Sequence, residues 1–497
     1  MKKITRRLLI AGCALLLCIS MLGFVSCTAT ESAQVLFRKA ISRTVEQYEK
    51  FDLVSFAKDL GKGGKIKLTA ENIKVPTGEE SAVKGKGTAE FSFDVAKRTA
   101  SATASAELDG KKYEASGYLS ATDVAVKFDQ VLDKVYGISL KNAEKNLAKS
   151  VFYYDGDSEY ALPEEQYNMI IDALKTIEDN KDVEKTGKKL VDKYVKKLFG
   201  YLEKNAEYAK ENTETKVLEE SSVPAVLVTV SIDEKGLSAV IQSLWKDAKA
   251  DKELKNFIAD YILPLSGGNY EDVGDLYEDI DEEVDEFAEG AENADFEITV
   301  KYYLNKSSGA VMKGEVTLKS NGNKQQYTAE LGNKFKSFEG IKLSTRRAPS
   351  GGSWSDTVYV WLKVVENTKE QLSLKLVGSD GAGVPEVSLR YDKAENTVKV
   401  SMKDSYGDEA FAVKFGYVKK GSTITLKLTS LTQDGEKTDI PADFTLEIST
   451  KPSVSSIKKY TDILTLTEEN IEDLKDNIEE NLDKIEEDLT DQAKDSD

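Results

Sequence analysis

The sequence predicts an α+β protein with a large curved antiparallel sheet, or two such sheets, of meander type. Helices pack on the sheet, and an acidic amphipathic helix ends the chain. Two observations support this fold class. Over residues 88–128 and 296–448, apolar side chains recur at every second position, as in strands with one buried face. Between and after these stretches the apolar spacing becomes helical.

The first 26 residues are predicted to be a secretory signal. Basic residues lie between Lys2 and Arg7, and an apolar run covers residues 8–25. This pattern is typical of a signal peptide that is removed after export. The run approaches the roughly 18–20 residues that a spanning helix needs, so an uncleaved anchor helix and ordinary signal-peptidase cleavage are the alternatives. Either membrane-tethered form leaves most of the chain outside the cytoplasm.

The end of the signal reads Leu22-Gly23-Phe24-Val25-Ser26-Cys27, with a small residue directly before a cysteine. This segment resembles the lipobox of bacterial lipoproteins, although Phe24 and Val25 differ from the residues usual there. The resemblance implies that the Cys27 thiol carries a diacylglycerol group with palmitate-type chains, and that the signal is cut before Cys27. It also implies a lipid-anchored protein of the cell envelope, extracytoplasmic, on the cell membrane or the outer membrane.

Cysteine and histidine usage restricts the chemistry. The three cysteines, Cys13, Cys18 and Cys27, all lie in the signal or at its end, so a disulfide framework is excluded and a packed core must supply stability. The chain has no histidine, which excludes Ser-His-Asp triads, Cys-His dyads and HExxH zinc sites. We therefore expect no catalytic residues, no metal and no cofactor.

The net charge of −19 also restricts the partners. Removal of the signal takes away four basic residues, which leaves 68 − 4 = 64 basic against 87 acidic residues, or −23. Such a surface repels nucleic acid, so nucleic-acid partners are not expected. A protein partner stays unknown at this stage.

The spacing of apolar residues, together with the signal peptide, predicts six segments. Residues 33–60 favour one helix, and residues from about 140 to 215 are interpreted as helical. The expected segments are a signal peptide at 1–26, a tether and N-terminal helix at 27–62, an α+β half at 63–265, an acidic connecting segment at 266–295, an antiparallel β half at 296–450 and a C-terminal acidic helix at 451–497.

The acidic segment and the C-terminal segment both show helical apolar spacing. Residues 271–295 contain no Lys or Arg, and this segment is our expected boundary between two halves. Neither acidic segment has the residue order of a calcium-binding EF-hand loop, so solvated acidic faces are the better interpretation. Thr465 and Glu468 fit a capping box at the start of the last helix.

Two sets of residues are candidates for facing a ligand. Ala102, Ala104 and Ala106 follow one another along a predicted strand, where small side chains allow either a packed helix or the floor of a ligand cavity. Trp354, and Tyr359 and Trp361 on the second face of a later strand, could stack on sugar or line an apolar groove. The alternative for that strand is burial on both faces beneath a helix.

The element order is similar to that of LolA- and LppX-type half-barrel lipoproteins, in which a curved antiparallel sheet wraps helices. No motif carries this resemblance, which is one of fold alone. It implies a non-enzymatic envelope lipoprotein that binds a lipid or another apolar or amphipathic ligand between sheet and helices. The second hypothesis is a cell-surface scaffold or adhesin-type interaction protein, and the third and least favoured is a carboxylate-based hydrolase.

Overall fold

The structure is a computed structural model. It describes residues 31–76, 82–108, 110–178, 183–263, 270, 272–291, 295–332, 338–379, 382–404, 407–440 and 442–495. The predicted signal and Cys27 lie outside these residues.

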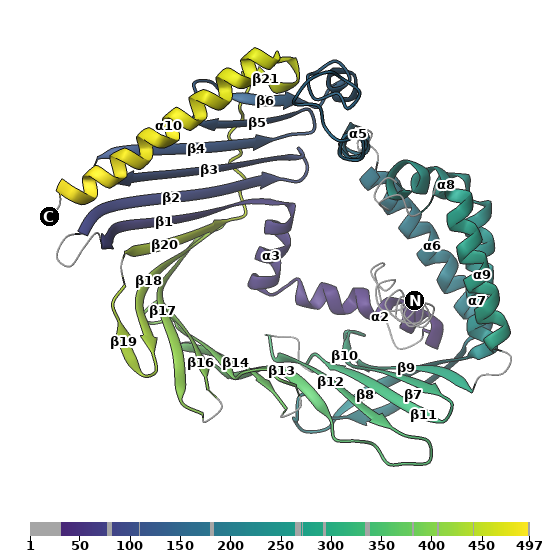
Figure 1. Ribbon diagram of the computed structural model, residues 1–497. Helices are drawn as coiled ribbons and strands as arrows, with labels where there is room; N and C mark the ends of the chain where they lie inside the picture. The colour runs from purple at the N-terminus through teal and green to yellow at the C-terminus, as the bar shows by residue number, and fades with distance from the viewer. Residues whose placement is uncertain are drawn as a thin grey trace. The chain divides into compact units, whose positions relative to one another are not determined.

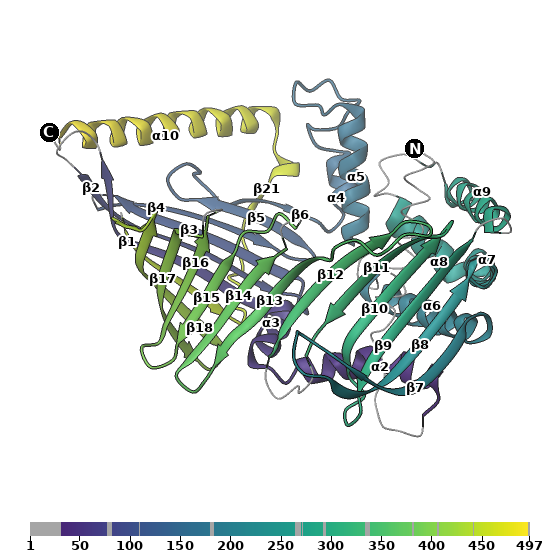
Figure 2. The ribbon, with the colours of Figure 1, turned by 90° about the horizontal axis from the view of Figure 1, so that it is seen from below.

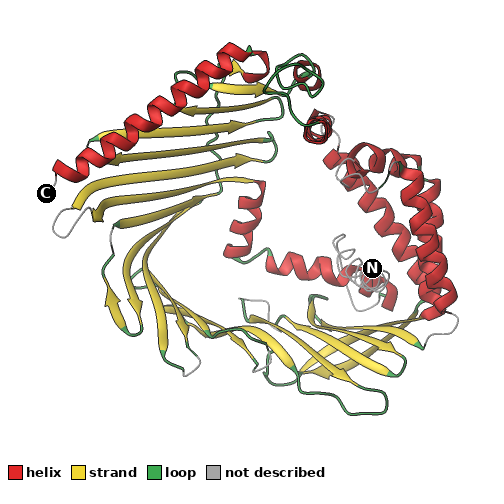
Figure 3. Cartoon of the chain, in the orientation of Figure 1, coloured by secondary structure: helices red, strands yellow, loops and turns green. Residues whose placement is uncertain are grey.

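The predicted α+β fold class is confirmed. The described residues form 21 strands that are hydrogen-bonded into a mostly antiparallel sheet, accompanied by helices (Figure 3). The chain divides into two compact units. Unit 1 contains Met1–Val54, Val183–Arg390 and Met402–Gly407, and unit 2 contains Ser55–Asp182, Tyr391–Ser401 and Asp408–Asp497.

The strands of unit 1 form a meander in which each strand pairs antiparallel with the next, from β7 to β14 (Figures 1 and 2). Their bounds are β7 Glu207–Thr215, β8 Val223–Asp233, β9 Phe296–Asn305, β10 Val311–Ser320, β11 Asn323–Glu330, β12 Gly340–Ala348, β13 Val358–Asn367 and β14 Gln371–Gly378.

The core of unit 1 lies between its helices and one face of β8 to β10. The Phe37 ring of α2 stacks on Tyr302 with ring centroids 5.2 Å apart, and both side chains are buried. Helix α7 packs between α6 and α9 (Figure 1). The helices of this unit are α2 Ala33–Tyr48, α6 Val183–Asn205, α7 Glu234–Ala250, α8 Lys252–Phe257, the π-helix Ile258–Ile262 and α9 Val273–Ala291.

A single carboxylate, Asp251, connects two of these helices, α6 and α8. It accepts hydrogen bonds from Lys193 Nζ at 2.5 Å and Tyr194 OH at 2.9 Å, both on α6, and caps α8 through the backbone N–H of Glu253 at 3.1 Å. Its side chain is only 7% exposed. Burial by itself would raise the pKa of this carboxyl, but the hydrogen bonds from Lys193 and Tyr194 outweigh burial and hold the pKa below its usual value.

We expect Asp251→Asn to lower the free energy of unfolding of unit 1 at neutral pH by about 1.5–3 kcal/mol, the usual value of a hydrogen bond to a charged group. Because the pKa is lowered in the folded state, the contribution of Asp251 is complete above the unfolded pKa and is lost as pH falls through the folded pKa. The difference from wild type should therefore shrink below about pH 4.

Urea unfolding followed by tryptophan fluorescence measures this effect, because all three tryptophans, Trp245, Trp354 and Trp361, belong to unit 1. The control is Asp192→Asn, since Asp192 is an exposed carboxylate on α6. A difference between Asp251→Asn and wild type that stays constant from pH 7 to pH 3 would contradict the assignment.

The sheet of unit 2 contains strands from the early and the late part of the sequence. Strand β1 pairs with β2 on one side and with β20 on the other, and β20 continues to β18 and β17. On the other side β2 leads through β3, β4 and β5 to β6, where β21 pairs in parallel. The bounds are β1 Gly63–Pro76, β2 Ala82–Asp94, β3 Thr99–Leu108, β4 Lys111–Leu119, β5 Asp123–Phe128, β6 Tyr136–Ser139, β17 Glu409–Lys420, β18 Thr423–Gln433, β19 Glu436–Thr438, β20 Asp443–Ser449 and β21 Thr461–Asp462.

The remaining elements are short, apart from the last helix. Strands β15 Val387–Asp392 and β16 Thr397–Lys403 contain residues of both units. The other elements are α3 Asp52–Lys62, α4 Ala143–Leu147, α5 Glu164–Glu178, the 3-10 helix Ile463–Thr465 and α10 Glu468–Asp495. Helix α10 has 28 residues and confirms the predicted C-terminal acidic helix.

Three local predictions were wrong. Thr465 does not cap the last helix, because it lies in the 3-10 helix Ile463–Thr465; instead Thr467 Oγ1 accepts from the backbone N–H of Asn470 at 3.3 Å. The predicted helix at 33–60 is two helices, because the chain turns at residues 49–51, where Phe51 N–H donates to the carbonyl of Tyr48 at 3.0 Å. Residues 207–215 are not helical but form β7, a largely exposed strand that pairs with β8. This strand could not be predicted from the sequence, because an edge strand with few apolar residues shows no clear alternation of apolar and polar residues.

The compact units also differ from the halves expected from sequence. The acidic segment contains α9, which packs on α7 inside unit 1 instead of connecting two halves. Residues 63–128 and 443–449, which sequence analysis assigned to different halves, belong together in unit 2 because β1 pairs with β20.

Candidate functional site

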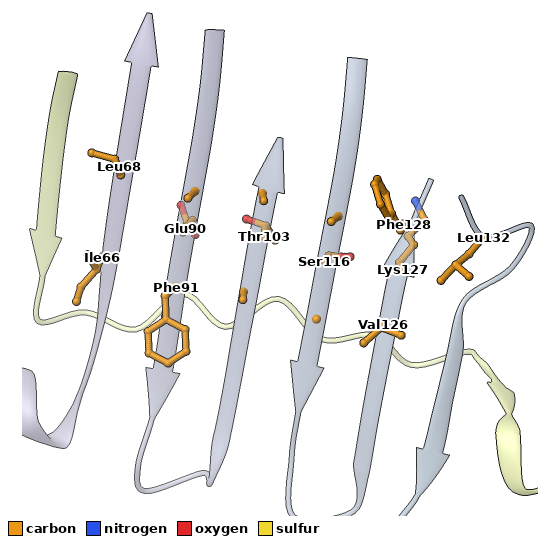
Figure 4. Close-up of a pocket in the computed structure, with 15 residues that line it drawn as sticks. Ile66, Leu68, Glu90, Phe91, Thr103, Ser116, Val126, Lys127, Phe128 and Leu132 are labelled. Carbon is orange, nitrogen blue, oxygen red and sulfur yellow. The ribbon is translucent and has the colours of Figure 1, made fainter. Parts of the chain in front are cut away.

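The candidate site is an apolar groove of about 690 Å³ on one face of strands β1 to β5 in unit 2 (Figure 4). Two rows of side chains cross these strands and form its surface. The first row is Ile66, Phe91, Ala102, Gly117 and Val126, and the second is Leu68, Ala89, Ala104, Ala115 and Phe128.

The shape of the groove follows from side-chain size along each row. In these two rows, large side chains stand on β1, β2 and β5, whereas β3 and β4 contribute only alanine and glycine. Figure 4 shows the large side chains on the two sides of the groove, with Ile66 and Leu68 on one side and Val126 and Phe128 on the other. The middle of the sheet is therefore lower than its sides. Glu90, Thr103, Ser116 and Lys127 also border the trough, but side chains alternate between faces along a strand, so theirs belong to the second face.

The groove exposes large apolar side chains to solvent. Phe91 and Val126 are each 46% exposed, and Leu68 is 44% exposed. Soluble proteins usually cover neighbouring apolar residues of this size, so an exposed cluster marks a site of interaction. Phe91 also stacks on Phe93 of the same strand, with ring centroids 5.7 Å apart.

The groove face carries no charged side chain in its two rows. Glu90, Thr103, Ser116 and Lys127 pair across the sheet in register on the second face. Lys127 forms an ion pair with Asp129 there. The two rows that a ligand would meet are therefore uncharged.

The second face is partly covered by the chain that follows β20. The backbone N–H of Ser453 donates to Ser92 Oγ at 2.7 Å, and that of Ser455 donates to Ser101 Oγ at 3.1 Å. Ser92 and Ser101 are buried. Part of the polar face is thus covered at Ser92 and Ser101, whereas Lys112 and Lys127 on the same face stay exposed.

Helix α10 reaches the rim of the groove. Asn481 Nδ2 donates to the carbonyl of Val131 at 3.2 Å, and the next residue, Leu132, lines the groove. Figure 1 shows α10 running across β2 to β6. Its apolar stripe is half-buried at Ile471, Leu474, Ile478 and Ile485. The helix therefore presents apolar side chains beside an apolar groove without filling it.

The predicted alanines divide between the groove and its surroundings. Ala102 and Ala104 line the groove and are exposed. Ala106 lies one pair further along β3, between Gly87 and Tyr113, outside the groove lining. Sequence analysis did not name the large groove residues, because four strands show the same alternation and only the register shows which residues share a row.

The three candidate aromatic residues lie in unit 1, so they form no part of the groove. Trp361 is buried against Val217, Leu218 and Met312. The ammonium of Lys342 lies 4.7 Å from the ring centroid of Tyr359 and 5.0 Å from that of Trp361.

Trp354 is occupied in a similar way, since the guanidinium of Arg346 lies 4.4 Å from its ring centroid. A cation therefore already lies over a face of each of the three rings, where it would compete with a stacked sugar. Strand β13 is not buried on both faces, because Trp361 is its only buried residue.

Two further observations concern the described residues alone. Within them, no helix combines the length and the apolar character needed to cross a membrane. The same residues hold no group of three or more Cys, Asp or Glu side chains arranged to bind a metal ion.

Fold and groove together define a class: an α+β protein whose antiparallel sheet keeps an open, uncharged apolar face. Comparison with known proteins adds no family to this description. No protein-family model matches the chain, and no curated protein sequence matches it.

Proposed function

We propose that this protein is a non-enzymatic, extracytoplasmic lipoprotein that binds an apolar or amphipathic ligand, such as a lipid, in the groove of β1 to β5. The observation that carries the proposal is the uncharged trough whose sides are large, exposed apolar side chains. Burying such a side chain completely is worth about 1.5–3 kcal/mol, and nearly half of each is still exposed, so each should contribute about 1 kcal/mol to ligand binding.

The dimensions of the groove favour an elongated ligand. From β1 to β5 the trough crosses four spaces between strands, each about 4.8 Å wide, which makes about 19 Å. An extended acyl chain suits a long, narrow and uncharged surface. The groove rows carry no carboxylate, so this site gives no support to carboxylate-based hydrolysis.

The proposed location rests on the N-terminal segment. The lipobox-like residues before Cys27 support attachment to a membrane through lipid on that thiol, which would hold the binding unit beside a supply of lipid. The groove and the membrane interior are both apolar, so a lipid at this location matches the groove in polarity.

The experiment that tests the proposal places a large side chain on the floor of the groove. A Cβ at Gly117 would meet no atom within 4 Å, so Gly117→Phe should fold and place a ring inside the trough. We expect apolar ligand to copurify with the wild-type protein, as seen by native mass spectrometry and lipid extraction. Gly117→Phe should lower ligand affinity at least about tenfold, which corresponds to about 1.4 kcal/mol.

The matched control is Gly416→Phe. Gly416 is a strand glycine of the same unit, it pairs with Lys427, and a Cβ there would meet only ordinary contacts at 3.8 Å or more. Its side chain would lie on the face of Lys427 and not on the groove face. Equal ligand occupancy in both variants, or a wild-type protein with an empty groove that takes up no lipid, would refute the proposal.

A further inference from the structure

A second cavity, of about 140 Å³, lies in unit 1 beside the start of α2. Its lining comes from α2, from β7 and from the hairpin between β9 and β10, and includes Leu36, Arg43, Lys210, Asn212 and Lys306. One water occupies about 30 Å³ of liquid, so this space suits a group of about four or five heavy atoms.

Arg43 is the most buried charged group in this cavity. Its side chain is 6% exposed, and its Nη2 donates to Glu31 Oε2 at 2.8 Å. Among the described residues, Glu31 is the only acceptor found for it. A guanidinium has five N–H donors, so this buried group keeps donors for a further acceptor.

The hairpin between β9 and β10 lies close to Arg43. Gly309 has a φ of +69°, and a Cβ at this residue would lie 2.5 Å from Arg43 Nη1. A side chain at residue 309 would push the guanidinium out of its place. The glycine therefore lets the hairpin approach Arg43 closely and close one side of the cavity.

Cations outnumber anions around the cavity. Lys210 Nζ donates to the backbone carbonyl of Glu31 at 2.8 Å, and Lys306 is exposed on the hairpin. Glu31 also pairs with Lys39 at 2.7 Å. Among the described residues that line the cavity, Arg43, Lys210 and Lys306 are cations and none is a carboxylate, in a chain whose net charge is −19. This local excess of positive charge attracts an anion.

We propose that this cavity binds the phosphate group of a membrane lipid headgroup. Arginine matches phosphate oxygens with paired N–H donors, and lysine adds a point charge. The lipid source, and not free phosphate, follows from position. Glu31, the ion-pair partner of Arg43, is four residues from Cys27, so at most about 14 Å of extended chain separates Glu31 from the proposed lipid attachment. This step rests on the proposed function.

The experiment uses the full chain in mixed micelles and two probes, a short-chain phosphatidylglycerol and inorganic phosphate, with binding followed by the ³¹P chemical shift. Lys306→Gln should weaken phosphatidylglycerol binding about fivefold, as expected for one cation near an anionic lipid surface. Lys324→Gln, which removes an exposed lysine elsewhere in unit 1, should bind like wild type.

Three outcomes would overturn the inference. Lys306→Gln could bind like wild type, Lys324→Gln could lose as much affinity, or inorganic phosphate could bind as tightly as the lipid. Fluorescence of the unit 1 tryptophans shows that each variant is folded. The Gly117→Phe experiment measures ligand binding in the groove of unit 2. Its result therefore does not depend on whether the cavity of unit 1 binds phosphatidylglycerol, and a failure of either proposal can be told from a failure of the other.

Discussion

Replacing Leu304 with alanine should lower the free energy of unfolding of unit 1 by about 2–5 kcal/mol, as for other large-to-small changes in a core. Leu304 is 1% exposed and belongs to the cluster that packs Phe37 of α2 on β8 to β10. Urea unfolding followed by tryptophan fluorescence measures the effect, because every tryptophan lies in unit 1.

The matched control is Leu343→Ala on the same face of the same sheet. Leu343 lies in register with Tyr302 through Gly314 and Ala329, yet it is 55% exposed. We expect a cost below about 1 kcal/mol, because much of this side chain is already in water. If the two substitutions lowered the free energy of unfolding equally, packing of α2 would not be what makes this part of the sheet face a core.

Replacing Cys27 with serine should abolish membrane retention almost completely and leave an unprocessed precursor. Serine has no thiol to accept the diacylglyceryl group, and the lipobox resemblance implies that lipid attachment precedes cleavage. The measurement is fractionation of cells into membrane and soluble material, with the size of the chain read on a gel. Globomycin, which blocks this class of cleavage, should also leave an unprocessed form of the wild-type chain.

The control for this prediction is Cys18→Ser, the same substitution inside the signal. It should leave maturation and membrane retention unchanged. Normal processing and retention of Cys27→Ser would contradict the lipoprotein proposal. The apolar groove would then need a soluble source of ligand, which the Gly117→Phe experiment measures independently.

Much of the secondary structure could be predicted because it depends on local spacing. Alternation along β2 and β3 and the helical stripe of α10 are both visible in the sequence. Prediction was wrong where the local signal was weak. The polar strand β7 has almost no apolar face, and the turn at residues 49–51 interrupts a stripe that continues on both sides.

The candidate site could be predicted only in part. The small residues Ala102 and Ala104 pointed to a surface that something approaches, and both line the groove. Phe91 and Val126 could not be assigned to the same row, because their alignment depends on the pairing of four strands. Trp354, Tyr359 and Trp361 attracted attention by residue type, but Lys342 and Arg346 already lie over their rings.

The sequence by itself determined the α+β class, the acidic balance and the lack of histidine, because composition and spacing are properties of the chain alone. The tertiary structure decided which strands meet. Ile66 pairs with Ile448, nearly four hundred residues away, and no local pattern specifies such a partner. It also decided exposure: the same kind of apolar strand face is core beneath α2 at Leu304 and an open groove at Phe91, since a face becomes core only where another element covers it.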